Sequence, residues 1–202
     1  MYKEIDARIR RILDKIERLE PERRPEWGDP MPEEEASAFE AEWGIRLPED
    51  YRRFITTVAP YCNYGPLDSW HMHSYLCKTI NKPFLYTVEH PMNLEHVYYK
   101  EELDRIQKEE SENGGGFFAI GYEGCTHYYV LVVNTPDPDT YGTVWYYDFG
   151  SDMGTLPLRD LETGQPFHFL DYLEFGVDQI PEDGEGCHIN FHKTFSFSRS
   201  DS

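Results

Sequence analysis

The spacing of the apolar residues changes once along this chain of 202 residues, and that change limits the folds it can form. Residues 2–20 carry Ile and Leu at steps of three and four, which predicts an amphipathic helix. After residue 113 the apolar residues gather in short runs typical of strands, at 117–121, 127–133 and 143–149. Helices followed by connected strands indicate an α+β fold with a mostly antiparallel central sheet.

Further patterns complete this outline. A second helix is expected to begin near Pro32 and stop at Gly44, and a third to take Pro48 as its first residue and end before Pro60. The apolar run at 127–133 is continuous enough to predict a central strand. The remaining expectations are a strand at 84–88, a helix at 94–110 and a closing helix at 167–175 that packs on the sheet with the N-terminal helices.

Charge is distributed unevenly. The chain has 19 basic and 38 acidic residues, which gives a formal net charge of −19. Residues 1–24 hold eight basic and six acidic residues, so the remainder carries −21. Such a field repels nucleic acid and anionic membranes and favours a basic partner. The alternative is that acidity only keeps the protein in solution. We expect no nucleic-acid partner and no membrane partner.

The sequence shows no targeting or membrane-spanning segment. No apolar run approaches the ~20 residues that cross a bilayer. The first residues, Met1 to Glu4, lead directly into a charged helical pattern without the apolar core of a signal peptide. We therefore expect a cytoplasmic protein.

Residues that could bind a metal are present, but their spacing is unfavourable. The four cysteines show no CxxC spacing, which favours buried thiols over disulfides or zinc ligands. His71 and His73 could reach one ion, but histidines bonded to water or backbone are commoner. The loop at Asp137 and Asp139 lacks the glycine and glutamate of an EF-hand. We expect no metal and no cofactor.

Catalytic patterns are equally weak. Cys125 and His127 could form a nucleophile and a base. However, no third member and no nucleophile elbow accompany them. The glycines at 114–116 lack the Lys-Ser/Thr of a phosphate-binding loop. We expect no catalytic residues, and a hydrolase remains the least favoured hypothesis.

Residues 39–54, FEAEWGIRLPEDYRRF, resemble the signature of the SUKH superfamily. This signature has a Phe-Glu pair on a helix, a glycine stop, and Leu-Pro-x-x-Tyr opening the next helix. With the strands that follow and the segment Phe167 to Leu173, the resemblance covers roughly residues 30–178. The motif residues, which we expect to be structural, are Phe39, Glu40, Trp43, Gly44, Leu47, Pro48, Tyr51 and Phe54.

Two features depart from the family pattern. Only part of the family's Asn-Gly-Gly turn survives at residues 60–65. The resemblance implies a core domain at 25–180, so the helix at 1–24 and the tail at 181–202 would be additions to it.

The superfamily includes the yeast cell-wall-assembly and glucan-synthase regulator and bacterial toxin-immunity proteins. The resemblance therefore implies a non-enzymatic protein-binding domain, first of all an immunity protein that neutralises a basic, nuclease-type toxin. The alternative is a regulatory scaffold that binds several cellular proteins. We expect the partner to contact exposed acidic residues and a tyrosine beside them. The candidates are Glu33, Glu34, Asp137, Asp139, Tyr141, Asp148 and Asp152.

Overall fold

The computed structural model describes residues 2–21, 24–60, 62–63, 116–122, 127–134, 138–148 and 155–179. The expected strand at 84–88, the expected helix at 94–110 and the tail at 181–202 lie outside these residues. The described helices are α1 (Lys3–Glu17), α2 (Glu33–Trp43), α3 (Glu49–Thr57) and α5 (Phe169–Gln179). The described strands are β1 (Glu26–Trp27), β2 (Cys62–Asn63), β3 (Gly116–Tyr122), β4 (His127–Asn134), β5 (Val144–Asp148) and β6 (Thr155–Pro157).

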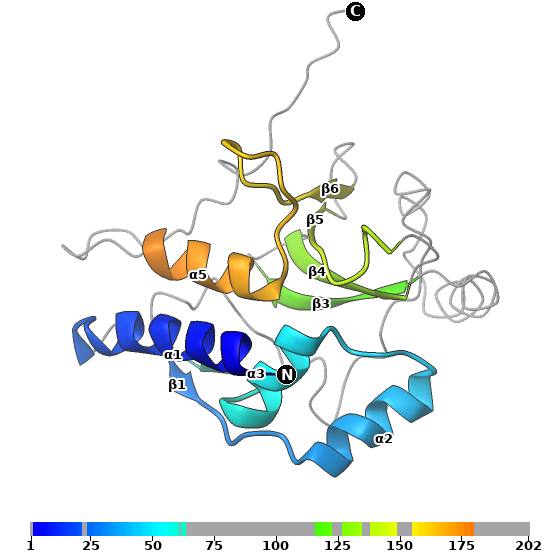
Figure 1. Ribbon diagram of the computed structural model, residues 1–202, viewed down its shortest axis with the longest axis horizontal. Helices are drawn as coiled ribbons and strands as arrows, with labels where there is room; N and C mark the ends of the chain where they lie inside the picture. Colours follow the sequence, from blue (N-terminus) through cyan, green and yellow to red (C-terminus); the bar gives the residue numbers. More distant parts are fainter. Residues whose placement is uncertain are drawn as a thin grey trace, which may run out of the picture.

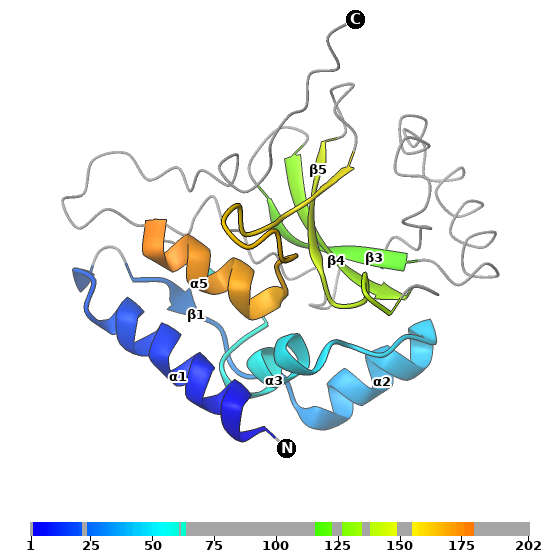
Figure 2. The same cartoon turned by 45° about the horizontal axis from the view of Figure 1, so that its top comes forward.

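These elements form an α+β fold, as the sequence indicated. Strands β3 to β6 form one antiparallel sheet in the order β3-β4-β5-β6. The four helices lie together on one side of it, with α5 between α1 and the sheet (Figures 1 and 2). The expected central position of the strand at 127–133 is confirmed, because β4 pairs with both β3 and β5.

Two pairings were not expected from the sequence. Strand β6 extends the sheet beyond β5, with Tyr146 opposite Leu156. In addition, β1 and β2 form a separate antiparallel pair in which Trp27 faces Cys62. The stretch between the first two helices, for which the sequence predicted no strand, therefore contains one.

The helix ends differ slightly from the expected ones. Gly44 ends α2 in the left-handed conformation with φ 61°, as its position predicted. Pro48 is not the first residue of α3, because its ψ of 139° is extended, and the helix begins one residue later. The closing helix runs over 169–179, and not over 167–175 as expected. Phe167 and His168 instead make backbone contacts like those of a strand. The N–H of Phe167 donates to Leu158 O at 2.9 Å, and His168 forms an isolated antiparallel β-bridge with Thr143.

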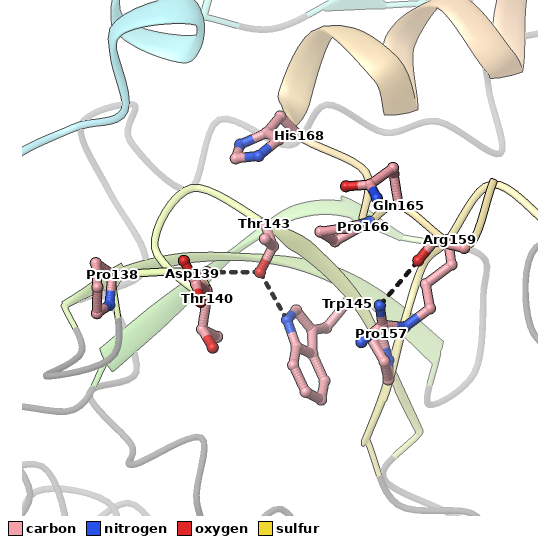
Figure 3. A pocket seen from close by; sticks show the side chains of 11 residues that line it. Pro138, Asp139, Thr140, Thr143, Trp145, Pro157, Arg159, Gln165, Pro166 and His168 are labelled. Atoms are coloured by element: carbon pink, nitrogen blue, oxygen red, sulfur yellow. Dashed lines mark hydrogen bonds between the residues drawn. The ribbon is translucent and has the colours of Figure 1, made fainter.

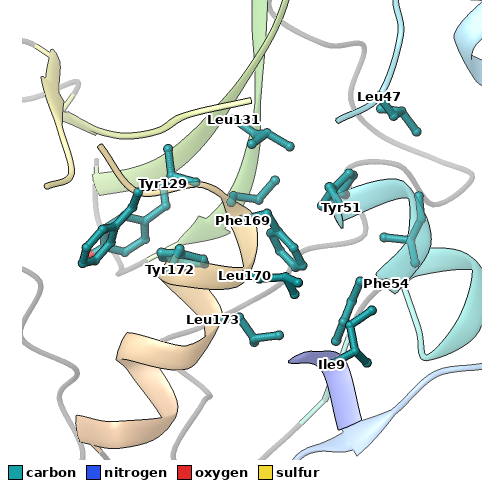
Figure 4. Close-up of a cluster of buried hydrophobic side chains, with 14 of the residues drawn as sticks. Ile9, Leu47, Tyr51, Phe54, Tyr129, Leu131, Phe169, Leu170, Tyr172 and Leu173 are labelled. Carbon is teal, nitrogen blue, oxygen red and sulfur yellow. The ribbon is translucent and has the colours of Figure 1, made fainter. Parts of the chain in front are cut away.

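The core lies between the helices and the sheet (Figure 4). The Phe169 ring at the start of α5 contacts the Tyr51 and Phe54 rings of α3, with centroids 4.9 and 5.3 Å apart. Tyr129, at 5.3 Å from the Tyr172 ring, connects α5 to β4. Helix α1 adds its apolar stripe to the same core through Ile9, Ile12 and Ile16.

Ion pairs join α1 to α5 along their partly exposed edges. Arg8 donates to Asp171 at 2.7 Å and to Glu174 at 3.0 Å. Seven residues further along α1, Lys15 donates to Glu174 at 3.0 Å and to Asp178 at 2.8 Å. The spacing of the acids on α5 matches that of the bases on α1, so the two helices are held in one register. In the described ranges, none of the helices has the length and apolarity needed to cross a membrane.

Candidate partner-binding face

Glu40, the acid of the Phe-Glu pair, holds the turn between α2 and α3. Its Oε1 accepts the backbone N–H of Leu47 at 2.7 Å, and its Oε2 accepts from Arg52 Nε at 3.3 Å. Arg52 also donates to Ser37 Oγ at 3.0 Å and to the Glu33 carboxylate. These contacts fix the approach of α2 to α3 and explain why an acid stands at this position.

Asp50 links α3 to the start of α5. Its carboxylate accepts the backbone N–H of Tyr51 at 2.8 Å and that of Leu170 at 3.2 Å. Burial raises the pKa of the Asp50 carboxyl above its ordinary value, and the two N–H donors only partly offset that effect. Asp171 completes the helix start, since it accepts the backbone N–H of His168 at 2.8 Å in the manner of a capping box.

The hairpin between β4 and β5 is clamped to this helical layer. The Tyr141 hydroxyl donates to the backbone oxygen of Arg46 at 2.9 Å, and burial raises the pKa of the Tyr141 phenol. Gly142 adopts φ 79°, and a Cβ there would lie 3.2 Å from His168 Nδ1 and 3.4 Å from Pro48 Cβ. Glycine therefore lets the hairpin approach both the Leu-Pro motif and α5.

A second hairpin-like loop, at 158–167, stands beside the first one. The backbones of Arg159 and Pro166 form an isolated antiparallel β-bridge. The Asp160 carboxylate accepts the backbone N–H groups of Glu162 and Thr163, each at 2.8 Å. These N–H donors lower the pKa of Asp160. The tip of this ordered loop presents Leu161, which is 60% exposed and is the one exposed large hydrophobic side chain of the described residues.

A pocket of about 570 Å³ lies between the two loops and is floored by β5 (Figure 3). Its side chains are held by a short chain of hydrogen bonds. Trp145 Nε1 donates to Thr143 Oγ1 at 2.9 Å, and that hydroxyl donates to Thr140 O at 2.6 Å. Arg159 Nη1 donates to Gly164 O at 3.1 Å. The volume falls in the range of sites that hold a ligand or a partner's side chain.

The structure brings together only some of the residues expected to contact a partner. Asp139 is exposed and lines the pocket, and Tyr141 belongs to the same hairpin. Glu33 and Glu34 are exposed at the start of α2, which Figures 1 and 2 place away from the sheet. Asp137 and Asp152 lie outside the described residues, and Asp148 is described only by its backbone, opposite His127 at the end of β5.

Sequence reasoning missed the side chains that define the pocket, namely Trp145, Arg159, Gln165 and His168, and the exposed Leu161. One signal was available. Between residues 116 and 179 the sequence holds ten acidic residues and a single basic one, Arg159. An isolated cation in an acidic stretch makes the local field differ from that of its surroundings, so the position can be singled out from the sequence.

The catalytic and metal candidates fall largely outside the described residues. This applies to His71, His73 and Cys125, and His127 is described only by its backbone. Within the ranges that the structure describes, no three His, Cys, Asp or Glu side chains gather in a way that could hold a metal ion.

Comparison with known proteins gives one match. The sequence model of the SMI1 / KNR4 family (SUKH-1) matches residues 30–166, well over half of the chain. Searches of curated proteins and of solved structures gave no significant match. The matched segment contains the Glu40 contacts, the hairpin between β4 and β5, all but the last residue of the second loop, and every pocket-lining residue except His168. It excludes α1 and α5, although both contribute to the same core.

Proposed function

Because the chain belongs to the SMI1 / KNR4 family (SUKH-1), we propose that it is an immunity protein that binds and neutralises a basic, nuclease-type toxin in the cytoplasm. The family consists of non-enzymatic immunity or regulatory proteins and so supports a role in protein binding. The family match, which spans the motif, the sheet and most of the pocket, is the observation that carries the proposal.

Charge supports a basic partner. A nuclease must bind phosphates, so its active cleft is positively charged, and an inhibitor with a net charge of −19 can occupy that cleft in place of the substrate. Exposed acids flank the pocket on both loops, with Asp139 on one and Glu162 on the other. Attraction of this kind accelerates the encounter and is weakened by salt.

The face around the pocket supports direct binding. Both loops are held by hydrogen bonds within the chain and by contacts to α5 and the α2–α3 turn. Binding to such preordered loops costs little conformational entropy. The pocket also presents Trp145 and Arg159, two residue types that are enriched at the centres of interfaces.

The test uses the full chain and the toxin domain encoded beside its gene. Co-expression should rescue growth, and the purified proteins should form a complex whose association slows markedly from low to physiological salt. A matched variant, Leu161→Glu, should keep the fold and weaken the complex. Failure to bind the neighbouring toxin, with capture of several housekeeping proteins at the same face, would instead favour a regulatory scaffold.

A further inference from the structure

We propose that the pocket between the two loops is a specific site for a carboxylate, supplied by an aspartate or glutamate side chain of the partner protein. Along the sequence, the charged residues between 116 and 179 are ten acids and a single basic residue, Arg159. The structure places this one cation in the wall of the pocket. The site therefore prefers a charge opposite to the one that the rest of the surface attracts.

The pocket has one carboxylate in its lining, Asp139, which stands on the opposite side from Arg159 (Figure 3), and the polar side chains on the Arg159 side are mainly donors. Arg159 carries five N–H donors, and Nη1 uses one of them on Gly164 O at 3.1 Å. That bond orients the guanidinium and leaves its other N–H groups available to a ligand, as far as the described residues show. Planar guanidinium groups pair with carboxylates through two parallel hydrogen bonds.

Two further side chains reach the same pocket. Gln165 and His168 are exposed, and within the described part of the chain their side chains make no hydrogen bond. Each can donate an N–H to an acceptor. In Figure 3 they stand on the upper side of the pocket, with Arg159 to the right and Trp145 below. The ring of His168 lies close to the backbone of Gly142, since a Cβ added there would stand 3.2 Å from its Nδ1.

The polar groups of Thr143 and Trp145, which also line the pocket, already have hydrogen-bond partners within the chain. Thr143 Oγ1 accepts from Trp145 Nε1 and donates to Thr140 O, so this hydroxyl is engaged on both sides. The indole, half-buried over β5, supplies apolar surface for the methylene groups of a ligand side chain. A donor-rich wall beside an indole suits a short acidic side chain better than a basic one.

Such a site has a use on an acidic inhibitor. Acidic residues attract any basic protein, including unrelated nucleic-acid-binding proteins. A pair between Arg159 and a carboxylate, covered when the complex forms, favours only a partner with an acid at the matching place, so it adds specificity and fixes the register. That the carboxylate comes from a toxin rests on the proposed function, whereas the preference of the pocket for a carboxylate does not.

The experiment titrates the full-length protein with N-acetylglutamate amide and follows the indole N–H signal of Trp145 by NMR, assigned with Trp145→Phe. We expect a saturable shift at millimolar concentration. The matched neutral probe, N-acetylglutamine amide, and the cationic probe, N-acetyllysine amide, should leave the signal unchanged. Arg159→Gln should weaken binding of the glutamate probe about tenfold or more, and Arg159→Lys less, because lysine keeps the charge without the planar fork.

Several outcomes would overturn the proposal: an equal response to the glutamine probe, a stronger response to the lysine probe or to inorganic phosphate, or unchanged binding in Arg159→Gln. The dispersion of the amide spectrum shows whether each variant is folded. If Arg159→Gln does not fold, Arg159→Lys still tests the site. No toxin is present, so this result is independent of whether the neighbouring toxin binds.

Discussion

The carboxylate of Glu40, on helix α2, accepts the backbone N–H of Leu47, seven positions further along the chain in the Leu-Pro turn, at 2.7 Å. Leu47 is 1% exposed, so without Glu40 its N–H would be left without this acceptor in a buried position. This hydrogen bond therefore joins the Phe-Glu part of the family motif to its Leu-Pro part.

Replacing Glu40 should destabilise the whole domain. We expect Glu40→Ala to lower the free energy of unfolding by about 2 kcal/mol, because it removes the acceptor of Leu47 N–H and a partner of Arg52. Urea denaturation followed by tryptophan fluorescence measures this loss. Glu34→Ala, an exposed acid on the same helix, is the control and should cost less than about 1 kcal/mol. Equal losses in the two variants would contradict the structural role of Glu40.

The pairing of α1 with α5 should be measurable in a double-mutant cycle. Arg8 and Glu174 lie at 3.0 Å, with side chains 29% and 24% exposed. Because the pair is only partly exposed and Arg8 donates to Glu174 through two nitrogens, we expect a coupling free energy of about 1 kcal/mol between Arg8→Ala and Glu174→Ala. Additive losses, with no coupling term, would show that the Arg8–Glu174 pair does not help to hold the two helices together.

Glu174 should also contribute to acid sensitivity. Burial alone would raise the pKa of Glu174, but hydrogen bonds from Lys15 and Arg8 outweigh it and hold that pKa below its ordinary value of 4.5. A carboxyl whose pKa is lowered by folding stabilises the folded state above the unfolded pKa and loses that effect as the pH falls through the folded pKa. Stability should therefore decline below pH 4.5.

The matched variant Glu174→Gln should show a shallower decline over the same pH range in urea titrations. Asp50 acts in the opposite sense, because its pKa is raised by burial and its ionised form is disfavoured in the fold. The comparison of wild type with Glu174→Gln cancels that contribution, so parallel curves would refute the role of Glu174.

Substitution of two glycines by alanine can distinguish the cost of a left-handed backbone from the cost of a close contact. Gly164 has φ 71° and no atom within 4 Å of an added Cβ, so Gly164→Ala should cost about 1 kcal/mol for the left-handed conformation alone. Gly142 has φ 79° and adds contacts of 3.2 Å to His168 and 3.4 Å to Pro48, so Gly142→Ala should cost more, about 2 kcal/mol or above. Urea midpoints compare the two, and a larger loss at Gly164 would contradict the described approach of the hairpin to α5.

Local patterns predicted the parts of the fold that depend on local physics. The stripe of α1, the stop at Gly44 and the central strand β4 follow from periodicity and backbone preference within a few residues. The start of the closing helix did not, because the backbone of His168 is held by the Asp171 side chain and by a bridge to Thr143. The second of these contacts is not visible in the local sequence.

The candidate site was predicted only at its edge. Asp139 was chosen for its charge and lies at the pocket, but the wall formed by Arg159 depends on β6. That strand has three residues and ends in a proline at the sheet edge, a pattern too short to read from sequence. Tyr141 was expected to be a partner contact, and the structure gives its hydroxyl a bond to the backbone oxygen of Arg46.

The contact between α1 and α5 also constrains how the protein is made. Arg8 and Glu174 are 166 positions apart. At roughly 5–20 residues per second, a ribosome needs on the order of ten to thirty seconds to travel from the first to the second. Throughout that interval the isoleucine stripe of α1 lacks the cover that α5 gives it in the folded protein, so the nascent chain exposes apolar surface there. A chaperone that acts on this protein should therefore bind its N-terminal helix.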